Sequence, residues 1–284
     1  MMFGPAAPAV GVVETLTGSP FGMQLVGGTQ PYFDPYGWDP EIGVDAAVEL
    51  LGWDCWRTHG GTPEEALDRL RAACERGPVM AGPLDLGLLT YSPGAVGDHY
   101  VVVLEVSGDT VVLHDPHGHP FATLPVADFL ASWRGEAVEY IDTSYVMRTD
   151  FVQVREISAP QALRESLPAA VRWLEGREDL PVQPGSLGGA AAAARLAEMV
   201  EDGLDDDVRG LLTYFGVRLG ARRLDDAATW LSNVGLATAG DVAREQARVL
   251  GGLQYPLATG DDAAVAAGLR RLAPGYDRLR TALL

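Results

Sequence analysis

Cysteine and basic side chains are scarce in this chain. Its 284 residues include only 2 cysteines, too few for a disulfide framework. Lysine and arginine together number 21 against 39 acidic residues, which gives a formal net charge of −18. A protein that binds nucleic acid or an anionic membrane needs a basic surface, and the sequence shows no basic stripe. We therefore expect neither nucleic acid nor a membrane among its partners.

Long hydrophobic runs are also missing. No stretch approaches the roughly 18 uninterrupted apolar residues of a membrane span. The first 20 residues contain no Lys or Arg and no long apolar run, unlike a secretory signal peptide. The hydrophobic content of 47% is nevertheless sufficient for two linked domains with cores of their own. These features predict a cytoplasmic protein.

Hydrophobic patterning divides the chain near residue 156. Capping signals at Asp39 and Thr62 predict two early helices, and β-branched runs cluster between Pro78 and Val154. After Ala159 only helical periodicity remains, and it predicts helices over 160–176, 189–202, 206–220, 224–235, 238–254 and 261–283. We predict an α+β domain with an antiparallel sheet over residues 1–156, followed by an all-α domain over residues 157–284.

Two apolar runs, 98–106 and 110–116, are separated by a Gly-Asp turn and predict a β-hairpin. His99 opens the first strand and Asp115 closes the second. A two-residue turn would point these side chains to opposite faces, because side chains alternate along a strand. A three-residue loop over 107–109 would make them neighbours on one face, within reach of a hydrogen bond. We predict the three-residue loop and a His99–Asp115 pair, against the alternative of two ordinary strand ends.

The residues around this hairpin resemble a known family. A strand that begins His-Tyr-Val-Val-Val and a next strand that ends His-Asp-Pro resemble the His and Asp strands of the papain-like C39 peptidases. Residues 77–148 are also similar to the N-terminal domain of butirosin biosynthesis protein H and its actinobacterial relatives, through the segments 82–87, 97–100 and 131–134. The resemblance implies a papain-like fold in which a thiolate attacks an acyl group, with His99 as base and Asp115 as its orienting partner.

The chain departs from this family at the nucleophile. The family's nucleophile is a Cys at a helix N-terminus near the start of the domain, whereas the first cysteine here is Cys55. Asp54 beside it disfavours a thiolate, and Cys74 lies within a predicted helix, so we predict that neither cysteine is catalytic. Ser19 stands in the region of the missing thiol. It is either a replacement nucleophile or, as is more usual for Ser before Pro, a capping or turn residue.

Other polar residues are candidates for substrate binding. Asp85 lies between apolar neighbours, where its carboxylate must be hydrogen-bonded or functional. Tyr91 lies on the loop that leads to His99. Polar residues alternate with aromatics in the N-terminal stretch, as in a pocket or a packed surface loop. Two arginines open a predicted helix, either as a solvated face or to hold an anion. The candidates are Asp85, Tyr91, Ser19, Gln24, Asp34, Arg222 and Arg223.

Three histidines and a carboxylate fall within the six residues 114–119, a density that raises the question of a metal site. The spacing matches no standard ligand pattern. Strand alternation should also turn His114 away from Asp115. We expect no metal and no other cofactor.

Three functions are compatible with these features. In the first, His99 held by Asp115 deprotonates an amine or hydroxyl in natural-product biosynthesis. An example is an amine of a small or carrier-protein-bound substrate that closes an aziridine-type ring while an anionic group leaves. The second is acyl transfer or amide-bond chemistry, as the resemblance implies, with Ser19 or a residue of a second protein chain as nucleophile. The third is a non-catalytic subunit that supports a partner enzyme. The missing thiol beside intact His and Asp motifs favours a repurposed site over a peptidase and leaves the non-catalytic subunit open.

Overall fold

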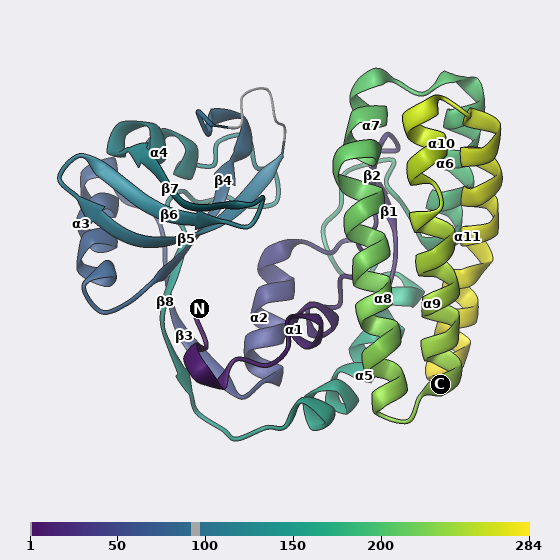
Figure 1. The fold of residues 1–284 in the computed structure, drawn as a ribbon, viewed down its shortest axis with the longest axis horizontal. Helices are drawn as coiled ribbons and strands as arrows, with labels where there is room; N and C mark the ends of the chain where they lie inside the picture. The colour runs from purple at the N-terminus through teal and green to yellow at the C-terminus, as the bar shows by residue number, and fades with distance from the viewer. Residues whose placement is uncertain (1, 92–96) are drawn as a thin grey trace. The chain divides into compact units, whose positions relative to one another are not determined.

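The computed structural model describes residues 2–91 and 97–284, which form two compact units (Figure 1). The first, here called the sheet unit, comprises the residues up to Ala7 and Trp53–Val154. The second, the helical unit, comprises Pro8–Gly52 and Arg155–Leu284. The predicted boundary at 156 lies next to the observed one at 154. The assignment of all residues 1–156 to one domain is wrong, because residues 8–52 pack with the helices instead.

A six-stranded antiparallel sheet forms the sheet unit, in the order β3-β8-β4-β5-β6-β7. Two helices, α3 and α4, pack on it, and short 3₁₀ turns lie at Gly4–Ala6 and Leu86–Leu88. This architecture confirms the α+β class with an antiparallel sheet. The elements are β3 (Trp53–Thr58), α3 (Pro63–Cys74), β4 (Val79–Asp85), β5 (Asp98–Ser107), β6 (Thr110–Asp115), β7 (His119–Pro125), α4 (Val126–Trp133) and β8 (Met147–Gln153).

One face of this sheet is the core of the unit. Alternate residues of β5 and β6, among them Val101, Val103 and Leu113, are buried against the apolar faces of α3 and α4. The start of α3 follows the predicted capping box, in which Thr62 and Glu65 bond each other's backbone N–H groups. Capping of this kind stabilises the helix, whose buried residues Ala66, Leu70 and Ala73 pack in the core of the unit.

The helical unit is a bundle with a small sheet. Helices α8 and α9 pack together, and α11 lies against both α6 and α9 (Figure 1). A three-stranded antiparallel sheet, in the order β2-β1-β9, joins residues early and late in the chain. The elements are α1 (Val10–Leu16), β1 (Gln24–Val26), β2 (Gln30–Tyr32), α2 (Pro40–Leu50), α5 (Ala159–Glu175), β9 (Leu187–Gly188), α6 (Gly189–Gly203), α7 (Asp206–Leu211), a π-helical turn (Leu212–Gly216), α8 (Val217–Asn233), α9 (Ala237–Gly251), α10 (Gln254–Thr259) and α11 (Asp262–Leu283).

Two features of this unit differ from the prediction. The region after residue 157 is not all-α, because β9 pairs with β1. The predicted helices 206–220 and 224–235 form one helical run from Asp206 to Asn233. Arg222 and Arg223 interrupt the apolar pattern there, but the helix continues through both residues. Their side chains bind carboxylates of the same unit.

Helices α1 and α2 explain why residues 8–52 join the helical unit. Helix α1 packs on α8 and α5, and α2 packs on α1 and α5. Asp39 caps α2 as predicted, by accepting from the Ile42 N–H. Over the residues that the structure describes, every helix is too short or too polar to cross a bilayer.

Candidate functional site

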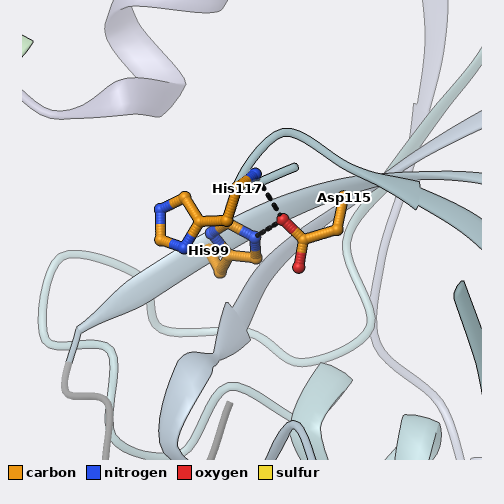
Figure 2. Close-up of side chains that lie close together, drawn as sticks. All are labelled: His99, Asp115 and His117. Atoms are coloured by element: carbon orange, nitrogen blue, oxygen red, sulfur yellow. Dashed lines mark hydrogen bonds and ion pairs between the residues drawn. The ribbon is translucent and has the colours of Figure 1, made fainter. Parts of the chain in front are cut away.

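His99 and Asp115 form a buried pair in the sheet unit (Figure 2). The imidazole Nε2 lies 2.8 Å from Asp115 Oδ1. His99 is 6% exposed and Asp115 4% exposed. The predicted contact is thus confirmed, at the end of the sheet face that carries Val101 and Leu113.

The strands bring the pair together by a different route from the predicted one. Ser107 faces Thr110 across a two-residue turn, with φ 58° at Gly108, a conformation that glycine tolerates. That register alone would have separated His99 from Asp115. A β-bulge between Val103 and Glu105 adds one residue to β5 and returns both side chains to one face. The prediction of a three-residue loop is wrong. The predicted placement of His99 and Asp115 on one face is correct.

Among the residues that the structure describes, three donors hold Asp115. Besides His99, the backbone N–H of His117 donates to Oδ1 at 2.6 Å, and the Tyr91 hydroxyl donates to Oδ2 at 2.9 Å. Burial by itself would raise the pKa of Asp115, but these hydrogen bonds outweigh it and hold the pKa below its usual range. Burial and the bond to Asp115 raise the pKa of Tyr91, so its hydroxyl stays protonated. Tyr91 therefore lies beside the pair as a partner of Asp115, and its role in binding a substrate stays a prediction.

The ionised carboxylate of Asp115 determines which nitrogen of the His99 ring donates a hydrogen bond and which can accept a proton. A carboxylate only accepts hydrogen bonds, so the proton of the neutral His99 ring lies on Nε2. The lone pair of Nδ1 is then the group that can take a proton from a bound molecule. This is the arrangement of a histidine general base whose tautomer is set by an aspartate.

The other histidines of the 114–119 segment differ in direction. His114 lies on the opposite strand face, as predicted, where Nδ1 accepts from the Phe121 N–H at 3.0 Å. His119 packs its ring 5.0 Å from that of Tyr91. The His117 ring lies over that of His99, with 4.4 Å between centroids (Figure 2). Sequence reasoning gave His117 no role, although Asp-Pro-His-Gly is a turn sequence that reverses the chain.

His99, Asp115 and His117 together have the composition of a metal-binding group. One ligand atom of each lies within 4.8 Å of those of the other two. The expectation that the chain binds no metal was based on the direction of His114, which points away from Asp115. It did not take account of His117, whose ring lies beside His99.

Asp85 is a structural residue in this unit. Its carboxylate accepts from the Gly87 N–H at 3.0 Å and caps the 3₁₀ turn at Leu86–Leu88. Its carbonyl accepts from Ser132 Oγ at 2.7 Å. Of the alternatives for this residue, the structure favours the hydrogen-bonded one.

Four other candidates meet in the helical unit. Ser19 Oγ donates to Asp34 at 2.5 Å, and Arg223 also binds Asp34. The guanidinium of Arg223 reaches Glu14 as well, at 2.6 Å, and Arg222 binds Glu14 at 3.1 Å. The arginines therefore bind carboxylates of this chain. This set of five residues is called the arginine network below.

The arginine network has little room for a substrate. The cavity beside Asp34 and Arg223 measures about 10 Å³, the space of a single water. Ser19 is fully buried, and the carboxylate next to it is already paired with Arg223, which weakens that carboxylate as a base. Gln24 uses both ends of its amide on the backbone of Gly37 and Trp38.

The cysteines lie in structural settings. Cys74 ends α3, and burial, helped by the nearby Glu105 charge, raises the pKa of its thiol to about 11. Such a thiol stays protonated at neutral pH. Cys55 lies in β3 at a register shift between Asp54 and Trp56.

Known proteins resemble both units of the chain. Residues 182–284, which include α6 to α11, match the YobF C-terminal domain family. The whole chain is 24% identical over 278 residues to the uncharacterized protein YobF of Bacillus subtilis (strain 168). That alignment covers 96% of this chain and 89% of the relative, so the similarity extends through the sheet unit and the helical unit.

Proposed function

We propose that this protein is a cytoplasmic enzyme of natural-product biosynthesis with a papain-like sheet unit, in which His99 acts as a general base without a cysteine nucleophile. The observation that carries the proposal is the buried 2.8 Å bond between His99 Nε2 and an ionised Asp115. It fixes one ring nitrogen as a donor and leaves Nδ1 as the proton acceptor.

The reaction class that suits such a base is an intramolecular substitution. Nδ1 of His99 removes a proton from an amine of the substrate as the nitrogen attacks a neighbouring carbon. The bond from that carbon to an anionic leaving group, such as a sulfate or phosphate ester, breaks with both electrons going to the anion. A three-membered aza-ring forms, and the imidazolium returns its proton to solvent. Asp115 stabilises the imidazolium in between, because its negative charge lies beside Nε2.

Acyl transfer through Ser19 has less support. Its hydroxyl is buried in the arginine network, and the carboxylate that it contacts is engaged by Arg223. A serine nucleophile needs an adjacent base that can accept its proton. A non-catalytic subunit remains the competing proposal, since it too would keep the scaffold while lacking the thiol.

A substrate panel tests the proposal. Amines with a sulfate or phosphate ester on the neighbouring carbon, free or attached to a carrier protein, are incubated with the wild type. Release of the anion and loss of the corresponding acid from the substrate mass are the readouts. We expect turnover by the wild type and by His114→Ala, and loss of turnover in His99→Ala and Asp115→Asn.

Further readouts separate the alternatives. A thiol alkylator should leave turnover unchanged. A stable acyl adduct on Ser19 after incubation with thioesters would instead support acyl transfer. Full activity of a co-purified second chain alone would support the non-catalytic role. Circular dichroism of each variant checks that the fold is retained.

A further inference from the structure

The turn after β6 places a second imidazole next to the base. Asp115 Oδ1 accepts from the His117 N–H at 2.6 Å, and its carbonyl accepts from the Gly118 N–H at 3.2 Å. These two bonds tighten residues 115–118 into a turn. The exposed His117 ring consequently lies next to the His99 ring, with 4.4 Å between centroids and the two planes tilted by 50° (Figure 2).

The ligand chemistry of this group is selective. Two imidazoles and one carboxylate suit Zn²⁺, Co²⁺ or Ni²⁺, whereas Mg²⁺ and Ca²⁺ prefer oxygen ligands alone. Ligand atoms around a tetrahedral zinc ion lie about 3.4 Å apart, given its bond lengths. The three ligand atoms here lie within 4.8 Å of one another, so their separations need to close by at most about 1.4 Å for coordination, and the His117 ring is exposed.

A supporting residue is already present. The Tyr91 hydroxyl donates to Asp115 Oδ2 at 2.9 Å and orients the carboxylate so that Oδ1 faces His99 and the His117 N–H. Hydrogen bonds of this kind orient the carboxylates that bind metals. With three protein ligands, a tetrahedral ion keeps one position for water.

We propose that His99, Asp115 and His117 form an exchangeable site for a divalent ion of the zinc class, and that the bound ion switches off the base. The second part rests on the proposed function. An ion on Nδ1 of His99 occupies the lone pair that accepts the substrate proton. An ion on Nε2 takes the place of the proton there, and a neutral ring then carries its one proton on Nδ1, to which that proton moves through solvent. In either mode the base is lost until the ion leaves.

Metal binding is tested first, without reference to activity. The full untagged chain, stripped of metal, is titrated with Co²⁺ and followed by its visible d–d absorption. Zn²⁺ binding is measured by calorimetry. We expect one ion per chain in the wild type and in the matched control His114→Ala, and binding weakened by more than about 10-fold in His117→Ala and Asp115→Asn. Absence of binding in the wild type, or equal binding in His117→Ala, would overturn the site.

The switch is tested second. Zn²⁺ at saturating concentration should abolish turnover of the wild type and of His114→Ala, and a chelator should restore it. His117→Ala, compared with its own metal-free rate, should resist the same Zn²⁺ concentration. Binding without loss of turnover would overturn the switch. If His99→Ala is fully active while Co²⁺ still binds the wild type, the general-base function fails and the metal site stands.

Discussion

Asp115 in the sheet unit and Asp34 in the helical unit are both buried carboxylates, 4% and 8% exposed, and each binds a basic side chain. Asp115 holds a histidine, whose ring keeps a second nitrogen for proton transfer. Asp34 holds Arg223, a permanent cation that also binds Glu14. A guanidinium does not give up its proton near neutral pH, so the second pair has no acid–base chemistry to offer.

The two carboxylates also differ in what they connect. Asp115 and its donors come from one stretch, residues 91–117, at the ends of neighbouring strands of a single sheet. The arginine network ties α8 to α1 and to the loop after β2, across more than 180 residues of sequence. Its role is to hold early and late parts of the helical unit together. We infer that damage to the first pair lowers activity and damage to the second lowers stability.

The largest effect is expected from His99→Ala. Removal of a general base typically lowers the rate by about 10²–10⁴-fold. Asp115→Asn keeps the shape but loses the charge that sets the tautomer, so turnover should fall severely as well. The matched control is His114→Ala, on the opposite face of the neighbouring strand. Turnover and melting temperature are measured for all three variants, and a fully active His99→Ala would contradict the general-base role.

The next effect is on stability. Arg223→Met leaves Asp34 and Glu14 without their buried partner, and loss of one member of a buried ion pair costs about 3–5 kcal/mol. Arg222→Met is the matched control, because the Arg222 side chain is 55% exposed against 15% for Arg223. Exposed pairs contribute about 1 kcal/mol or less. Urea unfolding measures both variants, and equal losses would contradict the larger contribution expected from the buried Arg223.

The cysteines should matter least to turnover. Cys74→Ala and Cys55→Ala are expected to keep near wild-type rates, with stability losses of about 1 kcal/mol or less. Because the pKa of Cys74 is about 11, its alkylation at pH 7 should be slow. Mass spectrometry of the alkylated protein follows the reaction at each thiol. A folded cysteine variant without turnover would place a thiol back in the mechanism.

The smallest effect is a pH dependence at the surface of the sheet unit. Hydrogen bonds from Arg76 and Thr149 lower the pKa of Asp150 to about 2. Its contribution to stability is complete above the unfolded pKa of about 3.9 and is lost as the pH falls towards 2. The stability that Asp150→Asn loses relative to wild type should therefore be larger at about pH 5 than at about pH 2. Thermal melts at both pH values measure it, and an unchanged difference would contradict the assignment.

Local patterns in the sequence were reliable where a few neighbouring residues decide the outcome. The cap at Asp39 and the capping box at Thr62 are both present, and the hairpin lies where the β-branched runs placed it. His99 and Asp115 were identified because no packing role explains a histidine and an aspartate at strand ends. Tyr91 followed from its place on the loop before them.

Long-range packing misled the same reasoning elsewhere. Gln24 and Asp34 were interpreted as lining a pocket or as part of a packed surface loop, and Ser19 as a nucleophile or a capping residue. All three side chains make hydrogen bonds inside the helical unit. Polarity next to aromatics does not reveal whether the partner is a ligand or another part of the chain. The Glu14 carboxylate that binds Arg222 and Arg223 lies more than 200 residues away in sequence.

The sequence by itself determined the class of fold, the capped helices and the hairpin, and it identified His99 and Asp115 as candidates, because each depends on propensities and alternation over a few residues. Only the tertiary structure decided the bulge that puts His99 and Asp115 on one face, the return of His117, and the membership of residues 8–52 in the helical unit. A bulge and a choice of packing partner depend on how distant surfaces fit, and no local pattern encodes that fit.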